Sequence, residues 1–91
     1  MSQDIQAEEY PVGDYYKNGV MDAQTISKAG QWWTALVLIE DPRSKKPFVS
    51  LYRWQKGDNG WKVRKQFKFN SKKESKKIIQ TLIEMAEEIP D

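Results

Sequence analysis

The spacing of apolar residues changes at Asn70-Ser71, and this change limits the possible folds more than any other feature of the chain. Residues 48–55 and 61–69 alternate apolar with polar side chains, which is the period of a half-buried β-strand. Beyond Ser71, apolar residues recur at the spacing of one helix face. These residues are Ile78, Ile79, Leu82, Ile83, Ala86 and Ile89. The change of period predicts strands followed by one C-terminal helix.

The flanking residues locate that helix and the remaining strands. Ser71 and Glu74 have the spacing of a capping box, and Pro90 ends the apolar run, so we expect a helix over roughly residues 72–89. The β-branched and aromatic run 32–39 predicts a buried central strand, and residues 24–28 a short one. The predicted fold class is α+β, a four-stranded antiparallel sheet followed by one C-terminal helix (ββββα).

The first part of the chain differs from the rest. Residues 1–22 carry turn signals at Tyr10-Pro11, Gly13 and Asn18-Gly19 and have no periodic apolar pattern. We therefore expect residues 1–22 to form a flexible acidic arm and residues 23–91 to form a single domain. Tyr15, Tyr16 and Val20 are the residues of the arm that could pack on the domain.

Composition excludes several functional classes. The chain has 91 residues and contains neither cysteine nor histidine, so the usual general base, thiolate nucleophile and soft metal ligands are missing. We expect no enzyme activity, no metal and no cofactor. A domain this small buries a limited fraction of its surface, which favours oligomerisation. The polar start and the short apolar run 32–39 predict neither a signal peptide nor a membrane span, hence an intracellular protein.

Positive charge is concentrated in one segment. Between Arg43 and Lys77 there are thirteen Lys or Arg residues against two acids, whereas residues 1–42 sum to −5 and residues 78–91 to −4. Phe48, Tyr52, Trp54, Trp61, Phe67 and Phe69 are interleaved with this basic segment. Cationic side chains attract a phosphate backbone and aromatic faces stack on unpaired bases. The segment therefore predicts a surface for single-stranded nucleic acid.

The register of the hairpin formed by residues 48–55 and 61–69 decides which aromatic residues are accessible, because a slip of one residue exchanges the two faces. If Lys56 lies opposite Trp61, then Phe48, Tyr52 and Trp54 join the apolar residues of the second strand in one aromatic core. If Gln55 lies opposite Trp61, these three residues instead lie on an open face beside basic side chains. The second register places Val49, Leu51, Val63, Phe67 and Phe69 under the helix, and we favour it.

Residues 48–79 resemble the positive-cofactor-four family of transcriptional coactivators, whose fold is similar to that of the plant whirly proteins. The family's domain has an alternating strand ending in Arg-Glu-Tyr-Trp, a glycine-containing loop, Arg-Lys-Gly-Ile-Ser-Leu-Asn and then an amphipathic helix. This chain has Val49-Ser50-Leu51-Tyr52-Arg53-Trp54, then Asp58-Asn59-Gly60, then Arg64-Lys65-Gln66-Phe67-Lys68-Phe69-Asn70. It departs from the family at Gln66, which replaces a glycine, and residues 1–30 and Trp32-Trp33 have no clear counterpart.

The resemblance implies a homodimer that binds single-stranded DNA or melted duplex, with the helices at the dimer interface and a partner in the transcription machinery. It implies that Arg64 and Lys65 contact phosphate, and that Tyr52 or Trp54 is the strand-end aromatic residue. The family's core positions fall on Val49, Leu51, Phe67 and Phe69, and its basic turn on Lys45 and Lys46.

The expected function is binding of single-stranded DNA with little sequence preference, in transcription or DNA maintenance, with RNA as the other candidate ligand. The expected binding residues are Lys45, Lys46, Phe48, Tyr52, Trp54, Lys62, Arg64, Lys65 and Lys68. By alternation, Lys62, Arg64 and Lys68 share one strand face and Lys65 lies on the other. The alternative function is a protein-interaction module that docks an acidic partner on its basic sheet.

Overall fold

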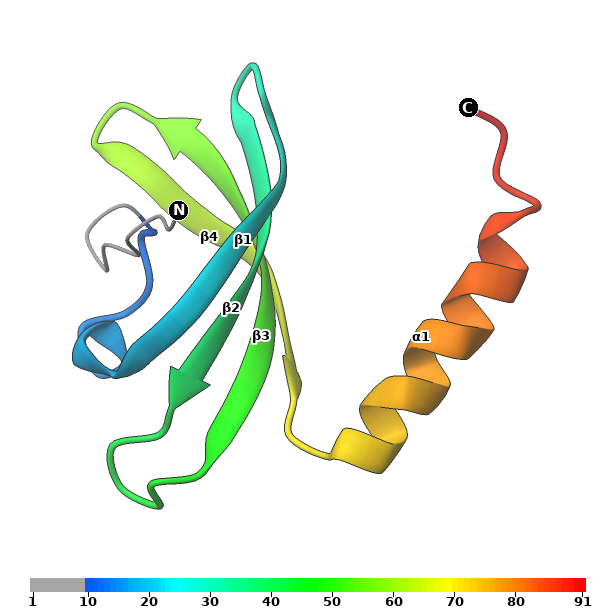
Figure 1. Ribbon diagram of the computed structural model, residues 1–91. Coiled ribbons are helices and arrows are strands. Elements are labelled where there is room, and N and C mark those ends of the chain that lie inside the picture. Colours follow the sequence, from blue (N-terminus) through cyan, green and yellow to red (C-terminus); the bar gives the residue numbers. More distant parts are fainter. Residues whose placement is uncertain (1–9) are drawn as a thin grey trace.

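The computed structural model describes residues 10–91 and shows the predicted ββββα fold (Figure 1). The elements are a 3₁₀ turn (Lys17–Gly19), β1 (Val20–Ala29), β2 (Trp32–Glu40), β3 (Pro47–Gly57), β4 (Gly60–Phe69) and α1 (Lys72–Ala86). The strands form one antiparallel sheet in the order β1-β2-β3-β4. The strand expected over residues 24–28 is longer at both ends, because it pairs with the whole of β2.

The buried core lies on one face of this sheet. Trp33, Ala35, Val37 and Ile39 alternate along β2, and Phe48, Ser50, Tyr52 and Trp54 alternate along β3 on the same side. Residues 10–19 cross this face, and their side chains pack against it. We call it the covered face. The expectation of a flexible arm is therefore wrong for residues 10–22, which contribute packing and the start of β1, while residues 1–9 lie outside the described residues.

A β-bulge in β4 divides the hairpin between two registers. On the loop side, Lys56 pairs with Trp61 and Trp54 with Val63, as in the first register considered. On the other side, Leu51 pairs with Phe67 and Val49 with Phe69, so these four residues share a face as in the second register, although the pairing differs from that register by two residues. Pairing shifts between Arg53 and Trp54, where Arg64 is the extra residue. The first register is thus right for the loop half of the hairpin, and the second is right for the other half only in which residues share a face, because a bulge exchanges the faces partway along a strand.

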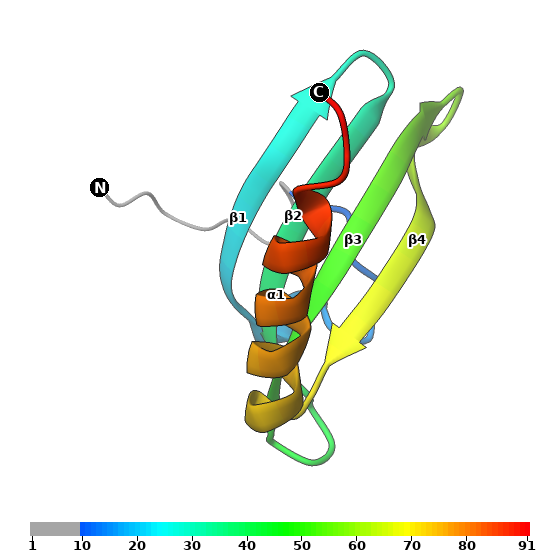
Figure 2. The same ribbon diagram turned by 90° about the vertical axis from the view of Figure 1, so that its right-hand side faces the viewer.

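The helix α1 begins as the capping signal predicts and then stands away from the sheet. Ser71 is its N-cap, and the Ser71 hydroxyl accepts a hydrogen bond from the Glu74 backbone N–H at 3.1 Å. Figure 2 shows α1 in front of the sheet face opposite residues 10–19, which we call the open face. The helix ends at Ala86 rather than near residue 89. It has the predicted apolar stripe, but Ile79, Leu82 and Ile83 are each at least half exposed.

Candidate nucleic-acid interface

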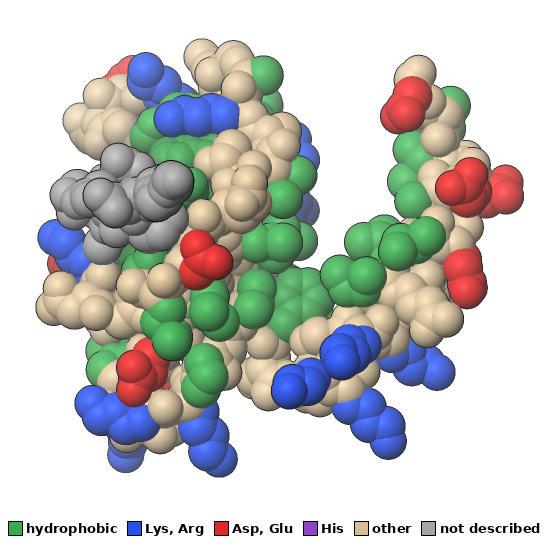
Figure 3. All heavy atoms as spheres, viewed as in Figure 1, with side chains coloured by type: hydrophobic (Ala, Val, Ile, Leu, Met, Phe, Trp, Pro, Cys, Tyr) green, Lys and Arg blue, Asp and Glu red, His purple; other side chains and the backbone are tan. Residues whose placement is uncertain are grey.

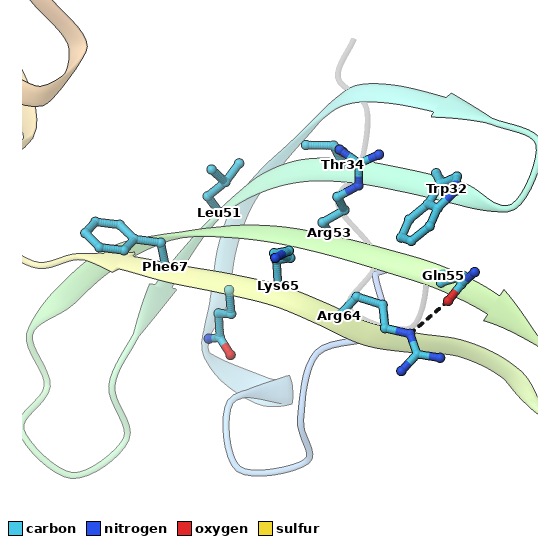
Figure 4. A pocket seen from close by; sticks show the side chains of 9 residues that line it. Trp32, Thr34, Leu51, Arg53, Gln55, Arg64, Lys65 and Phe67 are labelled. Carbon is cyan, nitrogen blue, oxygen red and sulfur yellow. Dashed lines mark hydrogen bonds between the residues drawn. The ribbon is translucent and has the colours of Figure 1, made fainter. Parts of the chain in front are cut away.

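A groove lies on the open face. It has a volume of about 770 Å³ and is bordered by β2, β3 and β4 (Figure 4). Its lining residues are Trp32, Thr34, Leu51, Arg53, Gln55, Arg64, Lys65, Gln66 and Phe67. Three of these residues are cationic and none is acidic, so the groove favours an anionic ligand.

The bulge explains how Arg64 and Lys65 come to lie in the same groove. Consecutive residues of a regular strand point to opposite faces. Here Lys65 lies directly opposite Arg53, and Arg64 is the extra residue of the bulge, so both line the groove. The Arg64 guanidinium donates a hydrogen bond from Nε to Gln55 Oε1 at 2.9 Å (Figure 4). This contact uses one donor of the guanidinium and leaves its other N–H groups for a ligand.

An exposed aromatic ring lies beside these cations. Trp32 is 39% exposed, and the Arg53 guanidinium lies 4.7 Å from the centre of its ring. Phe67 is 54% exposed at the other end of the groove. Lys62 pairs with Gln55 and so shares the open face with it. Aromatic surface and positive charge therefore alternate along this part of the sheet.

The rest of the open face is apolar and faces α1. Leu36, Leu38, Val49, Leu51 and Phe69 are only half buried there. Figure 3 shows hydrophobic side chains on this part of the sheet and on the side of α1 turned toward it, with a hollow between them. The open face thus has an apolar part under α1 and a cationic part around Arg53, Arg64 and Lys65.

The expected aromatic platform is on the wrong face for this groove. Phe48, Tyr52 and Trp54 are 7%, 2% and 0% exposed, so the prediction that they are accessible is wrong for this structure. They lie on the covered face beneath residues 10–19, and the Trp54 indole Nε1 donates a hydrogen bond to the Pro11 carbonyl at 3.0 Å. The sequence pattern identified a shared face correctly but not which segment would cover it.

The predicted basic residues divide between three places. Lys62, Arg64 and Lys65 share the open face, which corrects the expectation that Lys65 points away from the other two. Lys68 lies at the rim of the covered face, where its ammonium donates a hydrogen bond to Tyr16 Oη at 2.7 Å. That contact raises the pKa of Lys68 and keeps it charged.

The remaining two, Lys45 and Lys46, lie in the exposed turn between β2 and β3. That turn is at the opposite end of these strands from the Trp32–Gln55 pair. Lys45 and Lys46 are therefore not part of the groove.

Only Arg64 and Lys65 of the groove residues were among the predicted binding residues, and the most important omissions are Trp32 and Arg53. A signal for Trp32 exists in the sequence, because Trp32 and Trp33 are neighbours in one strand and cannot both face the core. The structure buries Trp33 and leaves Trp32 accessible. Arg53 alternates with the buried Tyr52 and Trp54 along β3, so it lies on the open face in the groove.

Within residues 10–91, no three acidic, histidine or cysteine side chains cluster as a metal site would require. No helix of this described part has the length and apolar character to cross a membrane. Comparisons with protein-family models, curated proteins and solved structures find no match for the chain. Function is therefore inferred from the residues and their geometry.

Proposed function

We propose that this protein binds single-stranded nucleic acid, with DNA as the first candidate, along the groove of the open face. The observation that carries the proposal is the juxtaposition of Arg64 and Lys65 with the accessible ring of Trp32. Adjacent phosphates of one strand would contact the two cations, and a base would stack on Trp32. The flat face of a base is covered by its neighbours in a duplex and becomes accessible to Trp32 in a single strand. The arrangement therefore favours a single strand over duplex.

Each side chain of the groove has a distinct part in this proposal. Arg64 presents a planar fork of donors that suits phosphate, and Gln55 holds that fork in place. Lys65 and Lys62 supply mobile point charges. Arg53 covers part of the Trp32 ring in the free protein and would move with an incoming base. Stacking and phosphate contacts do not distinguish bases, so sequence preference is expected to be weak.

The second part of the proposal is a homodimer formed through α1 and the apolar part of the open face. A lone subunit leaves the apolar stripe of α1 exposed to water. Charge is also segregated along α1: the acids Glu84, Glu87 and Glu88 are near its C-terminal end, and its start carries Lys72, Lys73, Lys76 and Lys77. Antiparallel association of two copies would bring these opposite charges together while burying both stripes.

A titration tests the ligand. A fluorescein-labelled dT oligomer, the matching rU oligomer and a duplex are each titrated with protein at several salt concentrations, and binding is followed by anisotropy. We expect the dT oligomer to bind more tightly than the duplex, with an affinity that falls as salt rises. Equal or tighter duplex binding, or an affinity independent of salt, would contradict the proposal.

The same titration distinguishes nucleic-acid binding from the alternative function, docking of an acidic protein partner. If no oligomer binds at physiological salt while a polyglutamate peptide does, the basic sheet docks an acidic protein segment instead. Binding to DNA or RNA would also support an intracellular location.

A further inference from the structure

Residues 10–19 form a strap across the covered face without pairing to it as a strand. The strap is held by side-chain contacts at three points. The Tyr10 hydroxyl lies 3.2 Å from Thr25 Oγ1, the Pro11 carbonyl accepts from the Trp54 indole, and the Tyr16 hydroxyl accepts from Lys68. The Tyr10 ring packs on Trp33 and the Tyr16 ring on Phe48. In Figure 1 the strap lies on the opposite side of the sheet from α1.

The surface beneath the strap has the composition of a second stacking platform. The rings of Tyr52 and Trp54 are stacked, with centroids 5.0 Å apart and planes within 7°. Cations lie toward both ends of the platform: Lys28 is 3.9 Å from the centre of the Trp33 ring, and Lys68 is 4.9 Å from that of Phe48. Aromatic planes flanked by cations are the components of single-strand binding surfaces.

The strap occupies the groups that a nucleic-acid strand would use. The Tyr16 hydroxyl takes the Lys68 ammonium that a phosphate would otherwise contact. The Pro11 carbonyl takes the Trp54 indole donor, and the Tyr10 ring packs on Trp33 at a tilt of 36°, with centroids 5.3 Å apart, where it covers ring surface that a base could use. Each of these contacts can be replaced by an equivalent contact with phosphate or base.

We propose that residues 10–19 are an intramolecular competitor, and that their release exposes a second binding face for single-stranded nucleic acid around Tyr52, Trp54 and Lys68. That the ligand is a nucleic acid rests on the proposed function. The strap and its release are inferred from the contacts of residues 10–19 and do not depend on that function. The closed state predominates in the free protein because it buries the aromatic core. A ligand shifts this equilibrium only by its preference for the open state, so the apparent affinity of the covered face depends on how firmly the strap is held.

Indole signals provide a direct test in the full chain. The protein has four tryptophans, so the ¹H–¹⁵N spectrum of the labelled protein contains four indole resonances, each assignable by substitution. On saturation with a dT oligomer long enough to span both faces, we expect the Trp54 resonance to shift as its bond to Pro11 is lost. Backbone amides of residues 10–19 should lose protection from hydrogen exchange at the same time.

The resonances also separate failure of this inference from failure of the proposed function. A shift of the Trp32 resonance alone would overturn the proposed release of the strap while supporting binding in the groove. A spectrum unchanged at every tryptophan would contradict both. A shift of Trp54 without Trp32 would support the covered face and contradict the groove.

A matched pair of variants measures how strongly the Tyr16–Lys68 hydrogen bond keeps the strap closed. Tyr16→Phe removes the hydroxyl that accepts from Lys68 and keeps the ring on Phe48. Tyr15→Phe makes the same change on a neighbouring residue whose side chain is exposed. With the loss of one hydrogen bond, Tyr16→Phe should tighten dT binding by about threefold to tenfold, and Tyr15→Phe should leave it unchanged. Unchanged or weaker binding by a folded Tyr16→Phe protein would overturn the proposal.

Discussion

Arg64 and Lys65 are consecutive residues of β4, yet both line the same groove on the open face. The bulge at Arg64 produces this relationship, because it inserts one residue between the Lys65–Arg53 and Val63–Trp54 pairs. Without the bulge, one of the two cations would point to the covered face. The bulge in β4 therefore places both Arg64 and Lys65 in the groove.

Neutralising this pair should weaken nucleic-acid binding and its dependence on salt. For the double variant Arg64→Gln/Lys65→Gln, loss of two phosphate contacts should lower the slope of log K against log salt by about 1.4 in magnitude. The measurement is anisotropy of a labelled dT oligomer at several salt concentrations. The control Arg43→Gln/Lys45→Gln removes the same charge from the exposed β2–β3 turn and should change the slope little. Equal effects in both variants would indicate diffuse attraction rather than binding in the groove.

Replacing Trp32 by alanine should weaken binding, whereas replacing Trp54 by alanine should reduce stability. Trp32→Ala should weaken oligomer binding by about 1–3 kcal/mol with little change in stability, because its ring is partly exposed. Trp54→Ala should reduce the free energy of unfolding by about 3–5 kcal/mol, because its fully buried ring would leave a cavity. Denaturant unfolding and anisotropy measure the two effects. A stable Trp54→Ala protein that binds normally would contradict the burial of this residue.

Placing a charge on the apolar stripe of α1 should prevent self-association. Leu82→Asp puts a carboxylate on the side of α1 that carries Ile79 and Ile83, where burial against a second copy would require its desolvation. Thr81→Asp introduces the same charge at a helix position turned away from Ile79 and Ile83 and is the control. Sedimentation equilibrium should give a dimer for the wild type and for Thr81→Asp, and a monomer for Leu82→Asp. A monomeric wild type would eliminate the proposed dimer.

Two glycines of the strap should differ in their tolerance of alanine. A Cβ at Gly19 would lie 2.4 Å from the Glu40 carbonyl oxygen, whereas a Cβ at Gly13 would meet nothing within 4 Å. Gly19→Ala should therefore destabilise the fold by about 1–3 kcal/mol through overpacking. Gly13→Ala should be neutral or slightly stabilising, since alanine restricts the unfolded chain. Thermal unfolding of both variants tests whether the strap enters β1 at the position described.

Much of the architecture could be predicted because its signals are local. The alternation of residues 48–55, the helical spacing after Ser71 and the capping pair of Ser71 with Glu74 each depend on neighbours in the sequence. The site was harder to predict, because Trp32, Arg53 and Lys65 come from three strands and meet only through register. One extra residue in β4 changes that register without altering the composition of the strand.

The amino-acid sequence by itself determined the order of elements, the start of α1 and the concentration of positive charge between Arg43 and Lys77. Only the tertiary structure decided that Phe48, Tyr52 and Trp54 are buried and that Trp32 is accessible. The physical reason is that alternation separates two faces of a strand but does not say what covers either one. Here residues 10–19, distant in sequence from Trp54, cover one face, and the bulge at Arg64 directs the cations to the other.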